Sequence, residues 1–227
     1  MENRQIVSID CDAVLFDLDG VLIDSSACIE RHWQQWAHAH GLDVGAVMRV
    51  AHGRRTVETM QLAAPHLDDV EAEARHFAAQ EALDTEGVFE IHGAVSLLHG
   101  LPPASWAIVT SGSRDVARAR LNHVGLPIPH VLITADDVIN GKPNPEPYLA
   151  AAHRLDLEAE QCLVFEDSPA GLAAAHAAGM QAVALSTTHR ASELERAVVI
   201  AERLGDIQVE AGSRNRLSIR VRGITEC

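Results

Sequence analysis

Two hydrophobic periodicities alternate along most of the chain. Short apolar runs of strand character are separated by longer stretches in which apolar residues recur every three or four positions, and this predicts an α/β fold with a mostly parallel sheet. The predicted strands are Ala13–Asp17, Trp106–Thr110, Val131–Thr134, Leu163–Glu166 and Ala182–Leu185. The helices after Ser113 and Ser168 are predicted to end near Gly125 and Gly179, because serine favours the N-cap and glycine the C-terminal turn.

Between Asp24 and His92 the strand pattern stops and only helical periodicity remains. The predicted helices are Ser25–His40, Val44–His52, about Arg54 to Ala64 and about Asp68 to Leu83. We interpret this stretch as an all-helical insertion after the first strand, which divides the chain into an α/β core (residues 1–24 and 93–227) and a helical unit (residues 25–92). The tail, residues 207–221, alternates with period two around Gly212-Ser213 and predicts a terminal hairpin.

Composition narrows the class of protein. The net charge of −14 opposes non-specific binding to nucleic acid or to an anionic membrane, and the sequence has no apolar run of the roughly eighteen residues that a membrane-spanning helix needs. Four widely spaced cysteines without a CxxC pattern indicate reduced thiols, and the first residues lack a secretion signal, so we expect a cytoplasmic protein. A monomer and a small homo-oligomer both remain open.

Polar residues follow four of the predicted strands, at the edge of a parallel sheet where ligands usually bind. The segments are Asp17 to Asp19, Thr110-Ser111-Gly112-Ser113, Gly141-Lys142-Pro143 and Glu166-Asp167-Ser168. Taken singly, each has an ordinary structural interpretation: a polar turn, a helix cap, a solvated lysine, a capping acid. Their joint placement, each just beyond a strand, favours a shared site.

Several carboxylates in one site need a counter-charge, since two unit charges ~4 Å apart repel by roughly 4 kcal/mol at an effective dielectric near 20. Lys142 alone does not neutralise them, whereas Mg²⁺ binds carboxylates and substrate phosphates together. The hydroxyls of Thr110 and Ser111, near a predicted helix start, favour a phosphate. The pattern therefore predicts a phosphoryl-transfer site in which one carboxylate is free to attack.

In this order the motifs resemble those of the haloacid dehalogenase (HAD) superfamily of aspartyl-nucleophile phosphohydrolases. The matching segments are FDLDGVLIDS (Phe16–Ser25), VTSGSR (Val109–Arg114), GKPNPEPY (Gly141–Tyr148) and FEDSPAGLAAAHAAGM (Phe165–Met180). The helical insertion resembles the cap of the branch that contains β-phosphoglucomutase and small sugar-phosphate phosphatases. HGRRT, DTEG and LSTTH are similar to segments of bacterial sugar or polyol phosphatases and of fungal glycerol-phosphate and 2-deoxyglucose-phosphate phosphatases.

The resemblance implies a Rossmann-like core with a helical cap, and a role for each matching residue. Asp17 would attack phosphorus, Asp19 would protonate the leaving alcohol and then activate water, Thr110 would hold a phosphoryl oxygen and Lys142 would neutralise charge. Mg²⁺ would be bound by Asp17, the backbone carbonyl of Asp19 and Asp167, with Glu166 ligating directly or holding a metal-bound water.

Residues for substrate binding are predicted in both units. The expected set is Ser111, Gly112, Ser113 and Arg114 from the core, and Arg54 and Arg55 from the cap. His32, His38 and His40 invite a metal interpretation, but the i, i+2 spacing of the last two does not place them on one helix face. We interpret the three histidines as surface or hinge residues.

The favoured function is a Mg²⁺-dependent phosphatase for small phosphorylated sugars or polyols. Hexose phosphomutase is the main alternative, although the cap histidine of family mutases is replaced here by Ile29, with His32 one turn later. A non-catalytic HAD-like binding module is a third possibility, disfavoured because the whole catalytic set is present. Asp19 argues against a haloacid dehalogenase proper, since dehalogenases lack that second aspartate.

Overall fold

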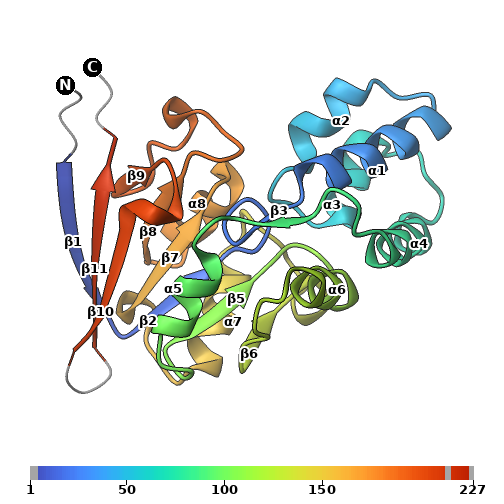
Figure 1. Ribbon diagram of the computed structural model, residues 1–227. Helices are drawn as coiled ribbons and strands as arrows, with labels where there is room; N and C mark the ends of the chain where they lie inside the picture. Colours follow the sequence, from blue (N-terminus) through green and yellow to red (C-terminus); the bar gives the residue numbers. More distant parts are fainter. Residues whose placement is uncertain (1–4, 213–215, 225–227) are drawn as a thin grey trace.

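The computed structural model describes residues 5–212 and 216–224. An α/β body carries a group of four helices on one side (Figure 1). Its central sheet has six parallel strands in the order β6-β5-β2-β7-β8-β9. The strands are β2 (Ala13–Phe16), β5 (Trp106–Val109), β6 (Val131–Ile133), β7 (Cys162–Glu166), β8 (Gln181–Leu185) and β9 (Val199–Ala201). The α/β prediction is confirmed; β9 was not predicted.

Strand β2 lies where the strand order reverses, because β5 and β6 extend the sheet on one side and β7, β8 and β9 on the other. All four of its residues are buried. Helices α5 (Ala94–Gly100) and α6 (Arg114–Val124) cover one face of the sheet, and α7 (Glu146–Arg154) and α8 (Pro169–Ala177) cover the other. The end of β2 is thus the topological switch point, where open α/β sheets bind ligands.

The four helices α1 (Ser26–Ala39), α2 (Val44–Ala51), α3 (Thr56–Ala63) and α4 (Val70–Leu83) pack around a hydrophobic cluster of their own, which includes Trp33, Met60 and Phe77. Asp43 and Asp69 cap α2 and α4 through their side chains. The chain passes between the body and these helices through β3 (Ile23–Asp24) and β4 (Phe89–Glu90), which pair antiparallel. The residue boundaries of the two units, 25–92 for the insertion, stay a prediction.

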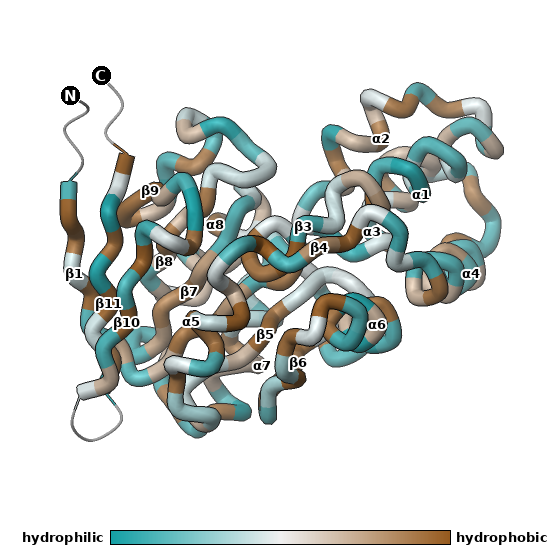
Figure 2. Tube along the Cα trace, in the orientation of Figure 1, coloured by the Kyte–Doolittle hydropathy of each residue, from teal (hydrophilic) through white to brown (hydrophobic). Residues whose placement is uncertain are grey.

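The tail forms the predicted hairpin from β10 (Ile207–Ala211) and β11 (Leu217–Gly223), while Ser213 of its turn lies outside the described residues. A strand that was not predicted, β1 (Gln5–Cys11), pairs along the other edge of β11. Figure 2 shows hydrophobic and hydrophilic residues alternating along these strands. The buried residues Ile9, Leu217 and Ile219 join this small sheet to the core of the body. Within the described residues, no helix has the length and apolar character needed to cross a membrane.

Candidate active site

A cavity lies where the strand ends of the body face the helices α1 to α4. The body contributes the residues that follow β2, β5 and β7, namely Asp17, Asp19, Thr110, Ser111, Gly112 and Asp167. The facing helices and their connecting loops contribute Ile29, Trp33, His52, Arg54 and Glu81. Both sides thus contribute charged groups, and the helical side adds the apolar side chains of Ile29 and Trp33.

Asp17 and Lys142 form the buried centre of this site. Asp17 follows β2 directly, and its backbone N–H donates to the Phe165 carbonyl (2.9 Å). Lys142, only 1% exposed, donates from Nζ to Asp17 Oδ1, to Glu166 Oε1 (2.6 Å) and to the Val109 carbonyl (3.0 Å). All three ammonium donors are therefore used, which a buried lysine requires.

Glu166 is fully engaged by hydrogen-bond donors. Oε1 also accepts from the Tyr148 hydroxyl (2.7 Å), and Oε2 accepts from Asp167 N–H (3.0 Å), Ser168 N–H (3.1 Å) and Ser168 Oγ (3.0 Å). A Cβ at Gly171 would lie 1.7 Å from Oε1, so only glycine lets α8 pack this closely. Burial disfavours the ionised form, but Lys142 and these donors outweigh it and lower the pKa of Glu166.

The pKa values of the other two buried carboxylates, Asp17 and Asp167, are raised rather than lowered. Burial is the largest cause that raises the pKa of Asp17 to about 8. Lys142 lowers this pKa, whereas the negative charges of Glu166 and Asp19 raise it further. Burial and the charges of Glu166 and Asp17 raise the pKa of Asp167 well above its usual range. Oxygen atoms of Asp17, Glu166 and Asp167 all lie within 4.8 Å of one another. Three carboxylates with one buried lysine suit a divalent cation, since such cations prefer oxygen ligands.

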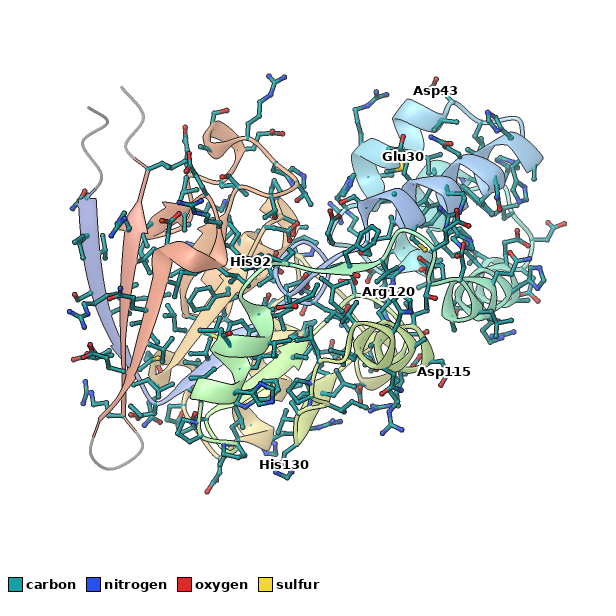
Figure 3. All side chains as sticks on the ribbon, in the orientation of Figure 1. Glu30, Asp43, His92, Asp115, Arg120 and His130 are labelled. Carbon is teal, nitrogen blue, oxygen red and sulfur yellow. The ribbon has the colours of Figure 1, made fainter. Side chains whose placement is uncertain are left out.

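Asp19 stands apart from that carboxylate cluster. Its Oδ1 accepts from Ser25 Oγ (2.6 Å) and from Arg120 of α6 (2.8 Å), and neither contact involves Oδ2. Figure 3 shows Arg120 where α6 faces the helical group. Asp19 lines the cavity, so it combines one anchored oxygen with a second that is available for proton transfer.

The loop after β5 lines the same cavity as Asp17. Thr110 is buried, and its Oγ1 accepts from Gly112 N–H (3.1 Å). Ser111 Oγ donates across the cavity to the Gly53 carbonyl (2.8 Å). Helix α6 begins only at Arg114, with Ser113 as its N-cap, so Thr110 and Ser111 belong to the preceding loop. The helix predicted after Ser113 therefore begins where the sequence places it, and Thr110 and Ser111 lie just before its start.

Comparison with known proteins decides the family. The haloacid dehalogenase-like hydrolase family matches residues 11–179. The chain belongs to this hydrolase family. It is similar to hexitol phosphatase A of Escherichia coli K12 (40% identical, covering 88% of this chain and 94% of the relative). It is also similar to glycerol-1-phosphate phosphohydrolase 2 of Saccharomyces cerevisiae S288c (37% identical, covering 80% and 77%). A hydrolase crystal structure from Pseudomonas syringae superposes with a TM-score of 0.76 at 27% identity, covering 84% of this chain and 93% of that one.

This HAD-like hydrolase keeps only part of the predicted substrate-binding set at the cavity. Arg54, Ser111 and Gly112 line it. The other three side chains are engaged elsewhere: Ser113 Oγ accepts from Val116 N–H, Arg114 pairs with Asp137 (2.6 Å), and Arg55 pairs with Glu58 (2.8 Å) and donates to the carbonyls of Val138 and Ile139. A direct substrate contact by Ser113, Arg114 or Arg55 stays a prediction.

The histidines of α1 do not gather at one place in this family member. His32 contacts Asp84 (3.0 Å) and His40 contacts Glu73 (3.0 Å), whereas His38 is exposed. His32 is buried rather than at the surface, and its ring packs against Phe77.

Sequence reasoning missed four residues of the site: Glu81, Arg120, Tyr148 and Thr188. Tyr148 closes the GKPNPEPY motif, and its buried hydroxyl is the partner of Glu166. Thr188, in the LSTTH segment, donates to Asp167 Oδ2. Glu81 and Arg120 lie within ordinary amphipathic helices, where a charged residue is usually solvated, so the sequence carries no signal for them.

Proposed function

We propose that this HAD-like hydrolase is a Mg²⁺-dependent phosphatase that acts on small phosphorylated sugars or polyols through an aspartyl-phosphate at Asp17. The observation that carries the proposal is the placement of Asp17: a buried carboxylate at the switch point of the sheet, paired with Lys142, opening into a small cavity. Relatives that are a hexitol phosphatase and a glycerol-1-phosphate phosphohydrolase support the substrate class.

The residues divide the chemistry between two steps. In the first, an Asp17 oxygen attacks phosphorus, the bond from phosphorus to the ester oxygen breaks, and Asp19 gives its proton to the departing alkoxide. In the second, Asp19 takes a proton from water as the water oxygen attacks phosphorus, the bond from phosphorus to the Asp17 oxygen breaks, and inorganic phosphate leaves with Asp17 restored. The Thr110 hydroxyl binds a phosphoryl oxygen in both steps, and Lys142 neutralises charge on Asp17 and on the phosphate, since phosphoryl transfer is catalysed mainly by positioning and charge stabilisation.

Asp17, Asp167 and the backbone carbonyl of Asp19 are the proposed Mg²⁺ ligands. The ion would neutralise charge between the carboxylates and the substrate phosphate. Glu166 already accepts five hydrogen bonds, so we assign it to holding Lys142 and the loop after β7, with any contact to the metal made through water.

The helical unit, residues 25–92, acts in this proposal as a cap that closes the site over a small metabolite. The Gly53 carbonyl of this unit accepts a hydrogen bond from Ser111 of the body, and Ile29 and Trp33 form an apolar wall of the cavity. In the proposal, these groups enclose the alcohol end of the substrate. The buried free thiols Cys11, Cys28 and Cys162 support a reducing, cytoplasmic setting.

The mutase alternative loses support at the cap. Ile29 occupies the cavity wall at the position of the mutase histidine, and His32 is turned instead to Asp84, outside the cavity lining. The histidine that lines the cavity is His52, which lies after α2 rather than on α1. Hydrolysis by water is therefore the reaction that the cap favours.

The test is phosphate release from a panel of hexitol, glycerol and hexose phosphates with Mg²⁺, run beside Asp17→Asn. We expect release from one compact group of substrates, lost by at least ~1,000-fold in the variant, because the amide cannot act as the nucleophile. Release that survives Asp17→Asn would overturn the assignment of the nucleophile. Conversion of β-glucose 1-phosphate to glucose 6-phosphate faster than phosphate release would favour the mutase.

A further inference from the structure

Arg120 connects the acid-base aspartate of the body to a carboxylate of the cap. It lies on α6, and its side chain is 3% exposed. One terminal nitrogen donates to Asp19 Oδ1 (2.8 Å), and the other donates to Glu81 Oε1 (3.0 Å) on the last turn of α4. Asp19 and Glu81 both line the active-site cavity, so the guanidinium bridges the two units at the site itself.

The bridge is unusual for a surface helix. A buried arginine costs several kcal/mol of desolvation unless its donors are matched by acceptors, and here its two acceptors come from different units. Glu81 is 7% exposed, so it depends in turn on Arg120 for a counter-charge. Moving α4 away from α6 would remove one acceptor from Arg120 and leave two buried charges incompletely paired.

Oδ1 of Asp19 has a second donor in Ser25 Oγ, at the start of the first cap helix. Two donors on one oxygen fix the plane of the carboxylate and leave Oδ2 for the leaving group. One of them, Ser25, is the N-cap of α1, and the other, Arg120, is held by α4 through Glu81. Both anchors of Asp19 thus depend on the position of cap helices.

We propose that Arg120 is a positioning residue that, held by Glu81 of the cap, orients Asp19 for proton transfer when the cap lies against the body. The inference rests on the proposed function, because it assigns Asp19 the acid-base role. What it adds is that the acid-base role of Asp19 depends on the contact between Arg120 and Glu81. The Asp19 carboxylate is correctly oriented only while α4 packs on α6.

The first experiment compares two phosphoryl donors with Arg120→Met. An alkyl ester such as glycerol phosphate needs a proton on its leaving oxygen, whereas acetyl phosphate releases acetate without one. We expect phosphorylation of Asp17 by glycerol phosphate to slow by about 100-fold, with KM changed by less than about 3-fold, and phosphorylation by acetyl phosphate to slow by less than about 3-fold. Hydrolysis of the phosphoenzyme should slow with both donors, since Asp19 also activates water.

The second experiment asks whether Glu81 acts through Arg120. Glu81→Gln should slow turnover of glycerol phosphate by about 10-fold, and Arg120→Met/Glu81→Gln should be no slower than Arg120→Met alone. The double variant also keeps the fold testable, because it removes both charges of the buried pair between Arg120 and Glu81. Arg120→Lys should recover part of the rate, since it keeps the charge but not the two-pronged geometry. Arg118→Met, at an exposed position of the same helix, is the matched control and should match the wild type.

The results separate this inference from the proposed function. Equal losses in the rate of Asp17 phosphorylation by glycerol phosphate and by acetyl phosphate, or fully additive effects of the two substitutions, would overturn the positioning role and leave Arg120 as a structural ion pair. Failure of the wild-type enzyme itself to release phosphate, or release that survives Asp17→Asn, would count against the proposed function whatever the Arg120 variants do.

Discussion

Gly20 lies against Asp167, a proposed metal ligand, with no room for a side chain. Its φ is +88°, a conformation that other residues adopt at a cost, and an added Cβ would lie 2.0 Å from Asp167 Oδ2. The DxDG sequence thus combines two functions at neighbouring positions: Asp17 and Asp19 are the proposed catalytic carboxylates, and Gly20 leaves room for the carboxylate of Asp167 to approach them.

Gly20→Ala should therefore displace Asp167 and lower kcat/KM by at least ~100-fold, while the protein stays folded at room temperature. Steady-state kinetics with Mg²⁺ and circular dichroism check the two parts. Gly100→Ala is the matched control, since a Cβ at that end of α5 meets nothing within 4 Å. Near-normal activity of Gly20→Ala would show that Asp167 has freedom to move.

A substitution at Tyr148 can show how far the stability of the fold depends on the hydrogen bonds to Glu166. The side chain is fully buried, and its hydroxyl donates to Glu166. Tyr148→Phe removes one donor from a buried carboxylate without changing the ring, so the free energy of unfolding should fall by about 1.5–3 kcal/mol. Urea denaturation measures this change, and an unchanged midpoint would show that Glu166 has replaced the lost donor.

At the level of elements, α3 is attached to the body by a small group of contacts next to Lys142. Arg55, its N-cap residue, donates to the carbonyls of Val138 (3.0 Å) and Ile139 (2.5 Å), and Glu58 accepts from Gly141 N–H (2.8 Å). These contacts hold the cap against the loop that positions the lysine. They form from backbone groups of the body, so they do not depend on the substrate.

Arg55→Ala should raise KM by about 3- to 30-fold, and by a similar factor for every substrate, because a smaller fraction of the enzyme then has the cap closed. Initial-rate kinetics on two substrates of different length provide the check. A loss confined to one substrate would instead assign Arg55 the direct binding role expected from its sequence. Arg49→Ala, an exposed arginine of α2, should leave KM unchanged.

At the scale of the whole molecule, the buried carboxylates link stability to pH and metal. Burial raises the pKa of Asp17 from 3.8 to about 8 and raises that of Asp167 as well. Without metal, the folded protein therefore keeps protons that the unfolded chain has released, so its stability falls as pH rises from about 4 to about 8.

Mg²⁺ requires the ionised carboxylates, and its stabilising effect should therefore grow with pH over the same window. At a concentration 100 times its Kd, the ion should add about 2.7 kcal/mol. Thermal unfolding at about pH 5 and about pH 8, with and without Mg²⁺, measures the trend. A larger shift at the lower pH would contradict the raised pKa values.

Three motifs of the candidate site were predictable because they directly follow β2, β5 and β7, and parallel strands bring those positions together; the Lys142 loop follows β6 after a short intervening segment. Arg120 was not predictable, since its two partners lie 101 and 39 positions away in the sequence. The same holds for β1, whose partner is the last described strand. Local patterns report which face of an element is buried, whereas the identity of a distant polar partner depends on packing between elements.

Lys142 is the only lysine in the sequence, and it is buried at the centre of the site. Amine-directed chemistry therefore has one side-chain target, which a reagent reaches only when the cap and the surrounding loops move apart. The rate at which a small acylating reagent inactivates the enzyme would report how often the active site opens, with no introduced label. Because the folded protein has no other lysine, crosslinking it or attaching it to a surface through lysine side chains should be inefficient.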